Sequence, residues 1–273
     1  MEVFANAKIN IGLQILRKRP DGFHDIASCF YPVQWADKLE ITPADTLGFS
    51  SSGLDIPGEA ADNLCLKAYR LLKADFPSLP AVHIHLQKIV PIGAGMGGGS
   101  SDAAFTLKVL NEMFFLGLSS ENLQHYARRL GSDCAFFVEN VPVLAKEKGD
   151  VFEKISLSLE GLHLLLVYPM LHVSTQEAYS GVKPQAPEIA IEKILQLPVN
   201  QWKNVLKNDF EVSIFPKYPV IEMLKNELYE AGALFASMTG SGSAVFGLFQ
   251  GNPPENYVNT LLEKKYVVWK EIL

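Results

Sequence analysis

The most informative segment of this chain is PIGAGMGGGSSDAA, which occupies residues 91–104. Five of the seven residues at 93–99 are glycine, although the whole chain of 273 residues contains only 20 glycines. Glycine is unfavourable inside helices and strands, so this density indicates a loop whose backbone approaches a ligand closely. A helix is expected to follow at 101–115, and its free N–H groups and positive dipole end favour a phosphate. The segment therefore predicts a phosphate-binding loop.

Three other interpretations of this segment are weaker. A flexible linker is disfavoured because a strand is expected directly before the loop and a helix directly after it. A Walker-type loop needs Gly-Lys followed by Ser or Thr, and the chain contains no such tripeptide. The dinucleotide pattern G-x-G-x-x-G is formally present at Gly93, Gly95 and Gly98. That pattern belongs in a βαβ unit, whereas here helices are expected in succession up to Leu130.

The loop resembles the nucleotide-binding loop of the GHMP kinases, with the pattern Pro-x-Gly-x-Gly-x-Gly-Gly-Gly-Ser-Ser. Two further segments agree with this family in order and position, AKIN at 7–10 and TGSGSAVF at 239–246. The resemblance therefore extends over the whole chain. It implies an α+β, two-domain kinase with the active site in the cleft between the domains. We expect a nucleotide-binding domain at 1–150 and a C-terminal α+β domain at 151–273.

Shorter segments resemble one branch of this family. They are AKIN at 7–10, RPDGFH at 19–24, DNL at 62–64, GSD at 131–133 and NDFE at 208–211. The branch uses ATP and Mg²⁺ to phosphorylate the 2-hydroxyl of a methylerythritol moiety carried on cytidine diphosphate, in the non-mevalonate route to isoprenoids. The alternatives are another GHMP enzyme, such as a homoserine or mevalonate-type kinase or a diphosphomevalonate decarboxylase, and a non-catalytic nucleotide-binding protein that kept the fold.

The resemblance implies two catalytic residues. Asp133 would accept the proton of the acceptor hydroxyl, and Lys8 would hold Asp133 ionised and polarise that hydroxyl. Taken alone, Asp133 reads as a helix cap and Lys8 as a solvated strand lysine. No protein ligand for a metal is assigned. His83 and His85 share one face of an expected strand, but no third ligand accompanies them.

The resemblance also implies two sets of binding residues. Asn63 and Lys88 would flank the adenosine, and the other ATP-binding residues are Pro91, Ile92, Gly93, Ala94, Gly95, Met96, Gly97, Gly98, Gly99, Ser100 and Ser101. On the acceptor side, His24 would form a hydrogen bond with cytosine between the rings of Phe23 and Tyr179. The remaining acceptor-binding residues are Asn10, Thr239, Gly240 and Ser241. For Asn10 the alternative is a hydrogen bond to the local backbone, and for the turn at 239–241 it is a tight hairpin.

Three positions depart from the family pattern. Phe23 stands where the family usually has Tyr, and Cys134 with Ala135 replaces the usual Val-Pro. Met96 replaces Leu in the glycine loop, which is a nearly isosteric change. None of these departures removes a group that the chemistry requires.

Composition narrows the class of protein. The 24 basic and 30 acidic residues give a net charge of −6, which does not favour a nucleic-acid partner. The three cysteines, Cys29, Cys65 and Cys134, form no C-x-x-C pair, which indicates a reducing compartment. No signal sequence is visible, and the apolar run at 162–171 is shorter than the ~20 residues of a membrane-spanning helix. We expect a cytoplasmic protein with a small-molecule substrate and no membrane partner.

Local patterns predict mixed secondary structure. Helices are expected at 63–76, capped by Asp62, and at 101–115, 119–130, 174–182, 187–196, 219–231 and 253–264. Strands are expected at 1–16, 24–33, 39–42, from 82 towards Pro91, and at 162–168, 234–238, 243–249 and 266–271. A polar hinge is expected at 146–159. Strands and helices do not alternate strictly, which favours α+β over a doubly wound sheet.

Overall fold

The computed structural model describes residues 1–273, apart from the side chain of Ala60, and its contacts divide the chain into two packing units. The first unit comprises Met1–Lys8, Pro32–Ile92 and Gly97–Val141, and the second comprises Ile9–Tyr31, Gly93–Met96 and Pro142–Leu273. Two long paired strands, β1 (Glu2–Lys18) and β2 (His24–Pro43), contribute residues to both units. The domain boundary expected at residue 150 stays a prediction.

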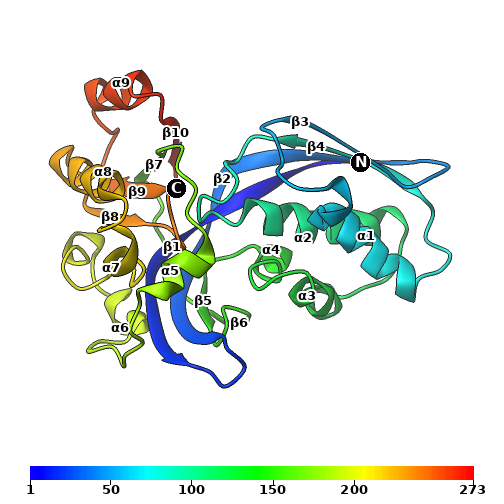
Figure 1. Cartoon of the computed structure of the whole chain (residues 1–273), viewed down its shortest axis with the longest axis horizontal. Coiled ribbons are helices and arrows are strands. Elements are labelled where there is room, and N and C mark those ends of the chain that lie inside the picture. The colour runs from blue at the N-terminus through cyan, green and yellow to red at the C-terminus, as the bar shows by residue number, and fades with distance from the viewer. The chain divides into compact units, whose positions relative to one another are not determined.

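In the first unit, β4 (Val82–Lys88) lies between β2 and β3 (Gly48–Gly53), antiparallel to β2 and parallel to β3. Alternate residues of β4 are buried, as expected for a strand with one face on the core. Helices cover one face of these strands (Figure 1). They are α1 (Leu64–Asp75), α2 (Gly98–Met113), α3 (Ser120–Arg128) and α4 (Phe136–Glu139), preceded by a 3-10 turn at Ala60–Asp62.

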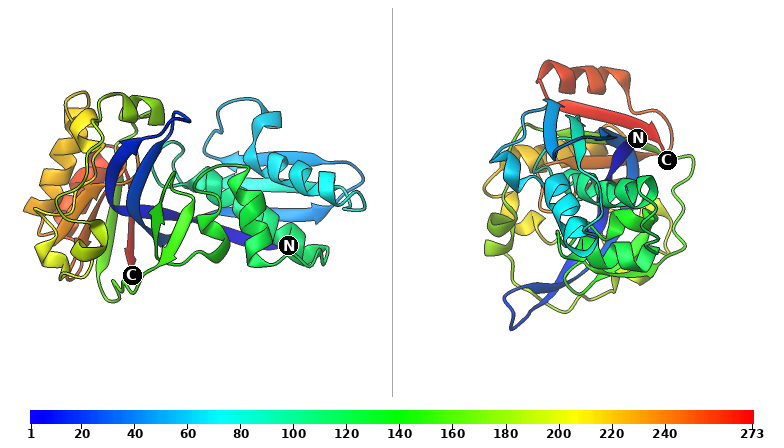
Figure 2. Two further views of the ribbon diagram at one scale, coloured as in Figure 1. Left: turned by 90° about the horizontal axis from the view of Figure 1, so that it is seen from below. Right: turned by 90° about the vertical axis from the view of Figure 1, so that its right-hand side faces the viewer.

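The second unit contains a four-stranded antiparallel sheet in the order β10-β7-β9-β8. Its strands are β7 (His163–Tyr168), β8 (Phe235–Met238), β9 (Val245–Phe249) and β10 (Val267–Ile272). The parts of β1 and β2 that lie within Ile9–Tyr31 form a curved hairpin in this unit (Figure 2). There β2 pairs with β5 (Val143–Lys146), and β5 pairs with β6 (Val151–Lys154). The helical segments are α5 (Thr175–Ser180), α6 (Ile191–Ile194), a 3-10 turn at Val199–Gln201, α7 (Glu211–Ile214), α8 (Pro219–Glu230) and α9 (Glu255–Glu263).

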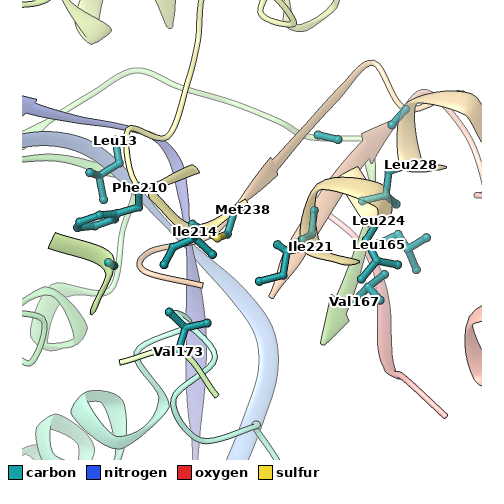
Figure 3. Close-up of a cluster of buried hydrophobic side chains, with 14 of the residues drawn as sticks. Leu13, Leu165, Val167, Val173, Phe210, Ile214, Ile221, Leu224, Leu228 and Met238 are labelled. Atoms are coloured by element: carbon teal, nitrogen blue, oxygen red, sulfur yellow. The ribbon is translucent and has the colours of Figure 1, made fainter. Parts of the chain in front are cut away.

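A buried apolar cluster joins these elements (Figure 3). Leu13 of β1 belongs to the same cluster as Phe210 and Ile214 of the α7 region and Met238 at the end of β8. Leu224 and Leu228 of α8 also belong to the cluster, and α8 packs on β8 and β9. The end of β8 is therefore held on several sides by core packing, which fixes the start of the turn that follows it.

Most expected elements are confirmed, with a few corrections. The strands expected at 24–33 and 39–42 are one continuous strand, β2. Asn63, and not Asp62, is the N-cap of α1, since its side chain accepts a hydrogen bond from the N–H of Cys65 at 2.9 Å. The expected hinge contains a strand, β6, and the helix expected at 187–196 is reduced to α6.

The strand β3 has no counterpart in the sequence-based expectation, because glycine and serine favour strands weakly. Its Ser50 Oγ lies 2.8 Å from ring nitrogens of both His83 and His85 on β4. These contacts explain both the polar strand and the two histidines. No helix in the described part of the chain has the length and apolar character needed to cross a membrane.

Candidate active site

The glycine-rich segment connects β4 to α2, and its backbone conformation requires glycine. Gly95 and Gly97 have φ angles of 82° and 70°, in the left-handed region that other residues disfavour. A Cβ atom on Gly95 would collide with the carbonyl oxygen of Thr239. The segment Gly93–Met96 therefore packs backbone to backbone against the turn at 239–242, within the second unit.

The loop presents one face and buries the other. Ala94, Met96 and Gly98 are buried, whereas Gly93 and Gly99 are exposed. The backbone of the loop is therefore accessible at Gly93 and Gly99. The loop residues predicted to bind ATP lie together in this segment and in the first turn of α2, and they are Pro91, Ile92, Gly93, Ala94, Gly95, Met96, Gly97, Gly98, Gly99, Ser100 and Ser101.

Lys8 and Asp133, predicted to be catalytic, form an ion pair within the first unit. Lys8 Nζ lies 3.2 Å from Asp133 Oδ2, and the lysine side chain is 3% exposed whereas the aspartate is 31% exposed. A Cβ atom on Gly97 would lie 3.3 Å from Cε of Lys8, so the glycine loop passes directly beside the pair. Asp133 is not the cap of α4, because Ala135 occupies the N-cap position. Its carboxylate is thus held by a lysine and open to solvent.

Lys88, predicted to flank the adenosine, belongs to a buried ion cluster. Its Nζ pairs with Asp37 and lies 2.9 Å from Asp102 Oδ2. Burial raises the pKa of Asp102, and the charge of Lys88 only partly offsets this effect. Burial also acts to lower the pKa of Lys88, but the two carboxylates outweigh it and raise that pKa. The ammonium group is therefore charged and holds two carboxylates, and its contact with ATP stays a prediction.

On the acceptor side, His24 and Tyr179 lie together in the second unit. Their rings stack with centroids 4.5 Å apart and planes inclined by 15°. Burial, assisted by the charge of Lys18, lowers the pKa of His24 and favours its neutral form. Phe23, expected to stack on the same base, is exposed and lies 5.2 Å from Nζ of Lys148. The structure therefore brings Tyr179 to His24 and leaves Phe23 on the surface.

The turn at 239–243 is anchored to β1. The backbone N–H of Asn10 donates to Thr239 Oγ1 at 2.9 Å, and the Asn10 side chain donates to Ser28 Oγ at 2.9 Å. Thr239 Oγ1 also donates to the carbonyl oxygen of Gly95 at 3.2 Å. Ser241 Oγ lies 3.5 Å from Thr175 Oγ1, and Gly240 lies within the turn with a φ of 54°. Asn10, Thr239, Gly240 and Ser241 thus form one connected group.

Comparison with known proteins gives the family. The family model described as GHMP kinases N terminal domain matches residues 63–140, and the one described as GHMP kinases C terminal matches residues 172–267. The chain belongs to the GHMP kinase family. It is 54% identical over 258 residues to a protein of Cytophaga hutchinsonii named 4-diphosphocytidyl-2-C-methyl-D-erythritol kinase, covering 94% of this chain and 95% of that protein. A Bacteroides fragilis protein of the same name is 49% identical over 276 residues, covering 100% of both chains.

Solved structures agree with this assignment. A crystal structure of 4-(cytidine 5'-diphospho)-2C-methyl-D-erythritol kinase superposes with a TM-score of 0.85 at 30% identity, covering 99% of this chain and 98% of the other. A homoserine kinase from Cytophaga hutchinsonii superposes with a TM-score of 0.68 at 17% identity, which shows the fold alone. The expected α+β GHMP fold is confirmed, and the chain is a small-molecule kinase.

The sequence alone does not indicate what the NDFE segment at 208–211 does in this GHMP kinase. The Asn208 side chain donates to the carbonyl oxygens of Met238 and Gly240 at 2.8 and 2.9 Å. The Phe210 ring meets the Tyr179 ring edge-on, with centroids 4.8 Å apart. The segment therefore supports both the turn and Tyr179. A buried asparagine cannot be told from an exposed one by its sequence, so only the family resemblance could draw attention to it.

Proposed function

We propose that this chain transfers the γ-phosphoryl group of ATP to the 2-hydroxyl of 4-diphosphocytidyl-2-C-methyl-D-erythritol, giving the 2-phosphate and ADP in the non-mevalonate isoprenoid pathway. The observation that carries the proposal is the Lys8–Asp133 pair beside Gly97 of the glycine loop. A phosphoryl-transfer site needs an aligned hydroxyl, a proton acceptor and charge neutralisation. Asp133 is suited to accept the proton, and Lys8 places a positive charge beside the glycine loop. The names of the relatives at 54% and 49% identity support the choice of acceptor.

In the proposed reaction, the acceptor hydroxyl attacks the γ-phosphorus while the bond to the ADP oxygen breaks. Asp133 accepts the hydroxyl proton, and Lys8 keeps the carboxylate ionised and polarises the hydroxyl. The 31% exposure of the Asp133 side chain leaves one face of the carboxylate open to an acceptor. Lys8 is buried and paired with Asp133, so it can hold the carboxylate in one orientation.

The nucleotide would bind on the glycine loop and the first turn of α2, because the N-terminus of a helix favours a phosphate. Mg²⁺ neutralises phosphate charge in such reactions and usually takes one or two protein oxygens together with the phosphates. Ser101 Oγ in the first turn of α2 is buried and has no hydrogen-bond partner among the described residues. It is the protein oxygen that fits a metal–nucleotide complex. Asn63, which caps α1, would lie on the adenosine side.

The cytosine would be recognised by His24, with Tyr179 stacked against it and Phe23 available from the surface. A neutral imidazole carries one acceptor and one donor nitrogen, which suits a base edge with an amino group and a ring nitrogen. Asn10, Thr239, Gly240 and Ser241 would hold the diphosphate side of the acceptor. Cys29, Cys65 and Cys134 are buried free thiols, which supports the proposal of a cytoplasmic location.

A panel of acceptors tests the proposal. We expect ADP release from ATP with the cytidine diphosphate compound and none with free methylerythritol phosphate, homoserine or mevalonate. Phosphorylation of homoserine or mevalonate at a comparable kcat/KM would contradict the proposed acceptor and leave the GHMP kinase assignment in place. Carbon dioxide release from diphosphomevalonate would instead identify the decarboxylase.

A further inference from the structure

The two ends of the glycine loop are attached to the same buried carboxylate cluster. Asp37 Oδ1 accepts hydrogen bonds from the backbone N–H groups of Ile89 and Val90, at 2.5 and 2.8 Å, directly before the loop. Its other oxygen pairs with Lys88. Lys88 Nζ also binds Asp102 Oδ2 at 2.9 Å, and Asp102 lies in α2 directly after the loop. All of these residues belong to the first unit.

The burial of this cluster excludes a role on the surface. The side chains of Lys88, Asp37 and Asp102 are 3%, 0% and 4% exposed. Burying two carboxylates and one ammonium is costly, so a buried cluster of this kind is weak evidence for a role in stability. A Cβ atom on Gly98 would lie 3.0 Å from Lys88 Nζ, so the lysine also packs against the first turn of α2. The cluster is therefore built against the loop.

We propose that Asp37, Lys88 and Asp102 are positioning residues that fix both ends of the glycine loop in the conformation that binds ATP. The proposal rests on the proposed function only in that ATP is the ligand of the loop. Without the cluster, the start of α2 and the end of β4 would no longer be held together. The backbone N–H groups at the start of α2 would then no longer converge on the phosphates. A small displacement of such groups is enough to lower affinity markedly.

The substitution Asp102→Asn removes one charge and keeps the shape of the side chain. It leaves the Lys88–Asp37 pair intact, so no unpaired charge is buried and the protein should fold. Because the N–H groups at the start of α2 would lose their fixed orientation, we expect the Kd for ATP to rise about tenfold, with kcat at saturating ATP nearly unchanged. Titration calorimetry with ATP alone measures this Kd without any acceptor.

A matched control distinguishes positioning from general stability. Asp75 at the end of α1 accepts a hydrogen bond from Tyr126 at 2.7 Å in the same unit, away from the loop. Asp75→Asn should lower the melting temperature and leave the Kd for ATP within twofold of the wild type. The positioning role is overturned if folded Asp102→Asn binds ATP like the wild type, or if both variants lose affinity to the same extent.

Discussion

Two lysine–aspartate associations flank the same loop in the first unit, and they differ in the exposure of the carboxylate. Lys8 pairs with Asp133, whose side chain is 31% exposed, whereas Lys88 pairs with Asp37 and Asp102, which are 0% and 4% exposed. Both lysines are 3% exposed. The same pair of residue types is therefore suited to two roles. An exposed carboxylate can contact a substrate, whereas a buried one is suited to positioning the backbone.

Consecutive glycines link the two associations. A Cβ atom on Gly97 would approach Cε of Lys8, and one on Gly98 would approach Nζ of Lys88, at 3.3 and 3.0 Å. The loop thus passes between the open pair and the closed cluster, and a side chain on either glycine would press on one of them. This arrangement explains why the loop carries glycine at both positions, and it lets substitutions separate catalysis from positioning.

The substitution Asp133→Asn should have the largest effect. It keeps the shape of the side chain but removes the proton acceptor, so we expect kcat to fall about a thousandfold, within the range for loss of a general base. The Kd for ATP should stay within a few-fold of the wild type. An ADP-release assay and titration calorimetry measure the two quantities. Asp62→Asn, at an exposed pair with Lys67, is the control; near-normal turnover of Asp133→Asn would remove the proposed catalytic role.

The substitution Gly97→Val should weaken ATP binding by a smaller factor, about a hundredfold or less. Valine is strained at a φ of 70°, and its Cβ would lie 3.1 Å from Cζ of Phe137 as well as beside Lys8. Gly117 has the same φ of 70° with no atom within 4 Å of a Cβ, so Gly117→Val carries the backbone strain without the contact. Thermal denaturation and ATP titration compare them. Equal ATP affinity in the two variants would show that the contacts of a residue-97 side chain with Phe137 and Lys8 do not affect ATP binding.

The sequence predicts the loop and the open pair better than the closed cluster, and the reason is physical. A glycine cluster indicates a backbone that approaches a ligand closely, and the GSD and AKIN segments identify Asp133 and Lys8 through family resemblance. Charged residues are mostly exposed, so nothing in the sequence indicates that Asp37 and Lys88 are buried together. The start of α2 at Gly98, three residues earlier than expected, follows from the same contacts, because glycine is a poor helix former without tertiary support.

The second unit extends the comparison to recognition of the base. His24→Ala should narrow the preference for the cytidine acceptor over its uridine analogue by about ten- to a hundredfold, because a site built for one base edge leaves polar groups unpaired with the other. Tyr179→Leu should weaken both acceptors alike, since stacking depends little on the base. The measurement is kcat/KM for each acceptor. Phe115→Leu is the control, because Phe115 is an exposed ring in the first unit; a loss of preference in Phe115→Leu as large as that in His24→Ala would contradict the assignment.

The smallest effect should come from pH. Burial and Lys18 lower the pKa of His24 below its ordinary value of 6.5, so the ring is neutral at pH 7 and can accept a hydrogen bond from the amino group of cytosine. Protonation as pH falls through the lowered pKa removes that acceptor. KM for the cytidine acceptor should therefore be constant at neutral and alkaline pH and rise on the acid side by at most about tenfold per pH unit, because a single group titrates. The uridine analogue offers no amino group, so its KM should change less, and His24→Ala should abolish the difference. If KM for both acceptors rises in parallel in the wild type and the variant, the titrating group is not His24, and base recognition must depend on a residue whose protonation state does not change in this range.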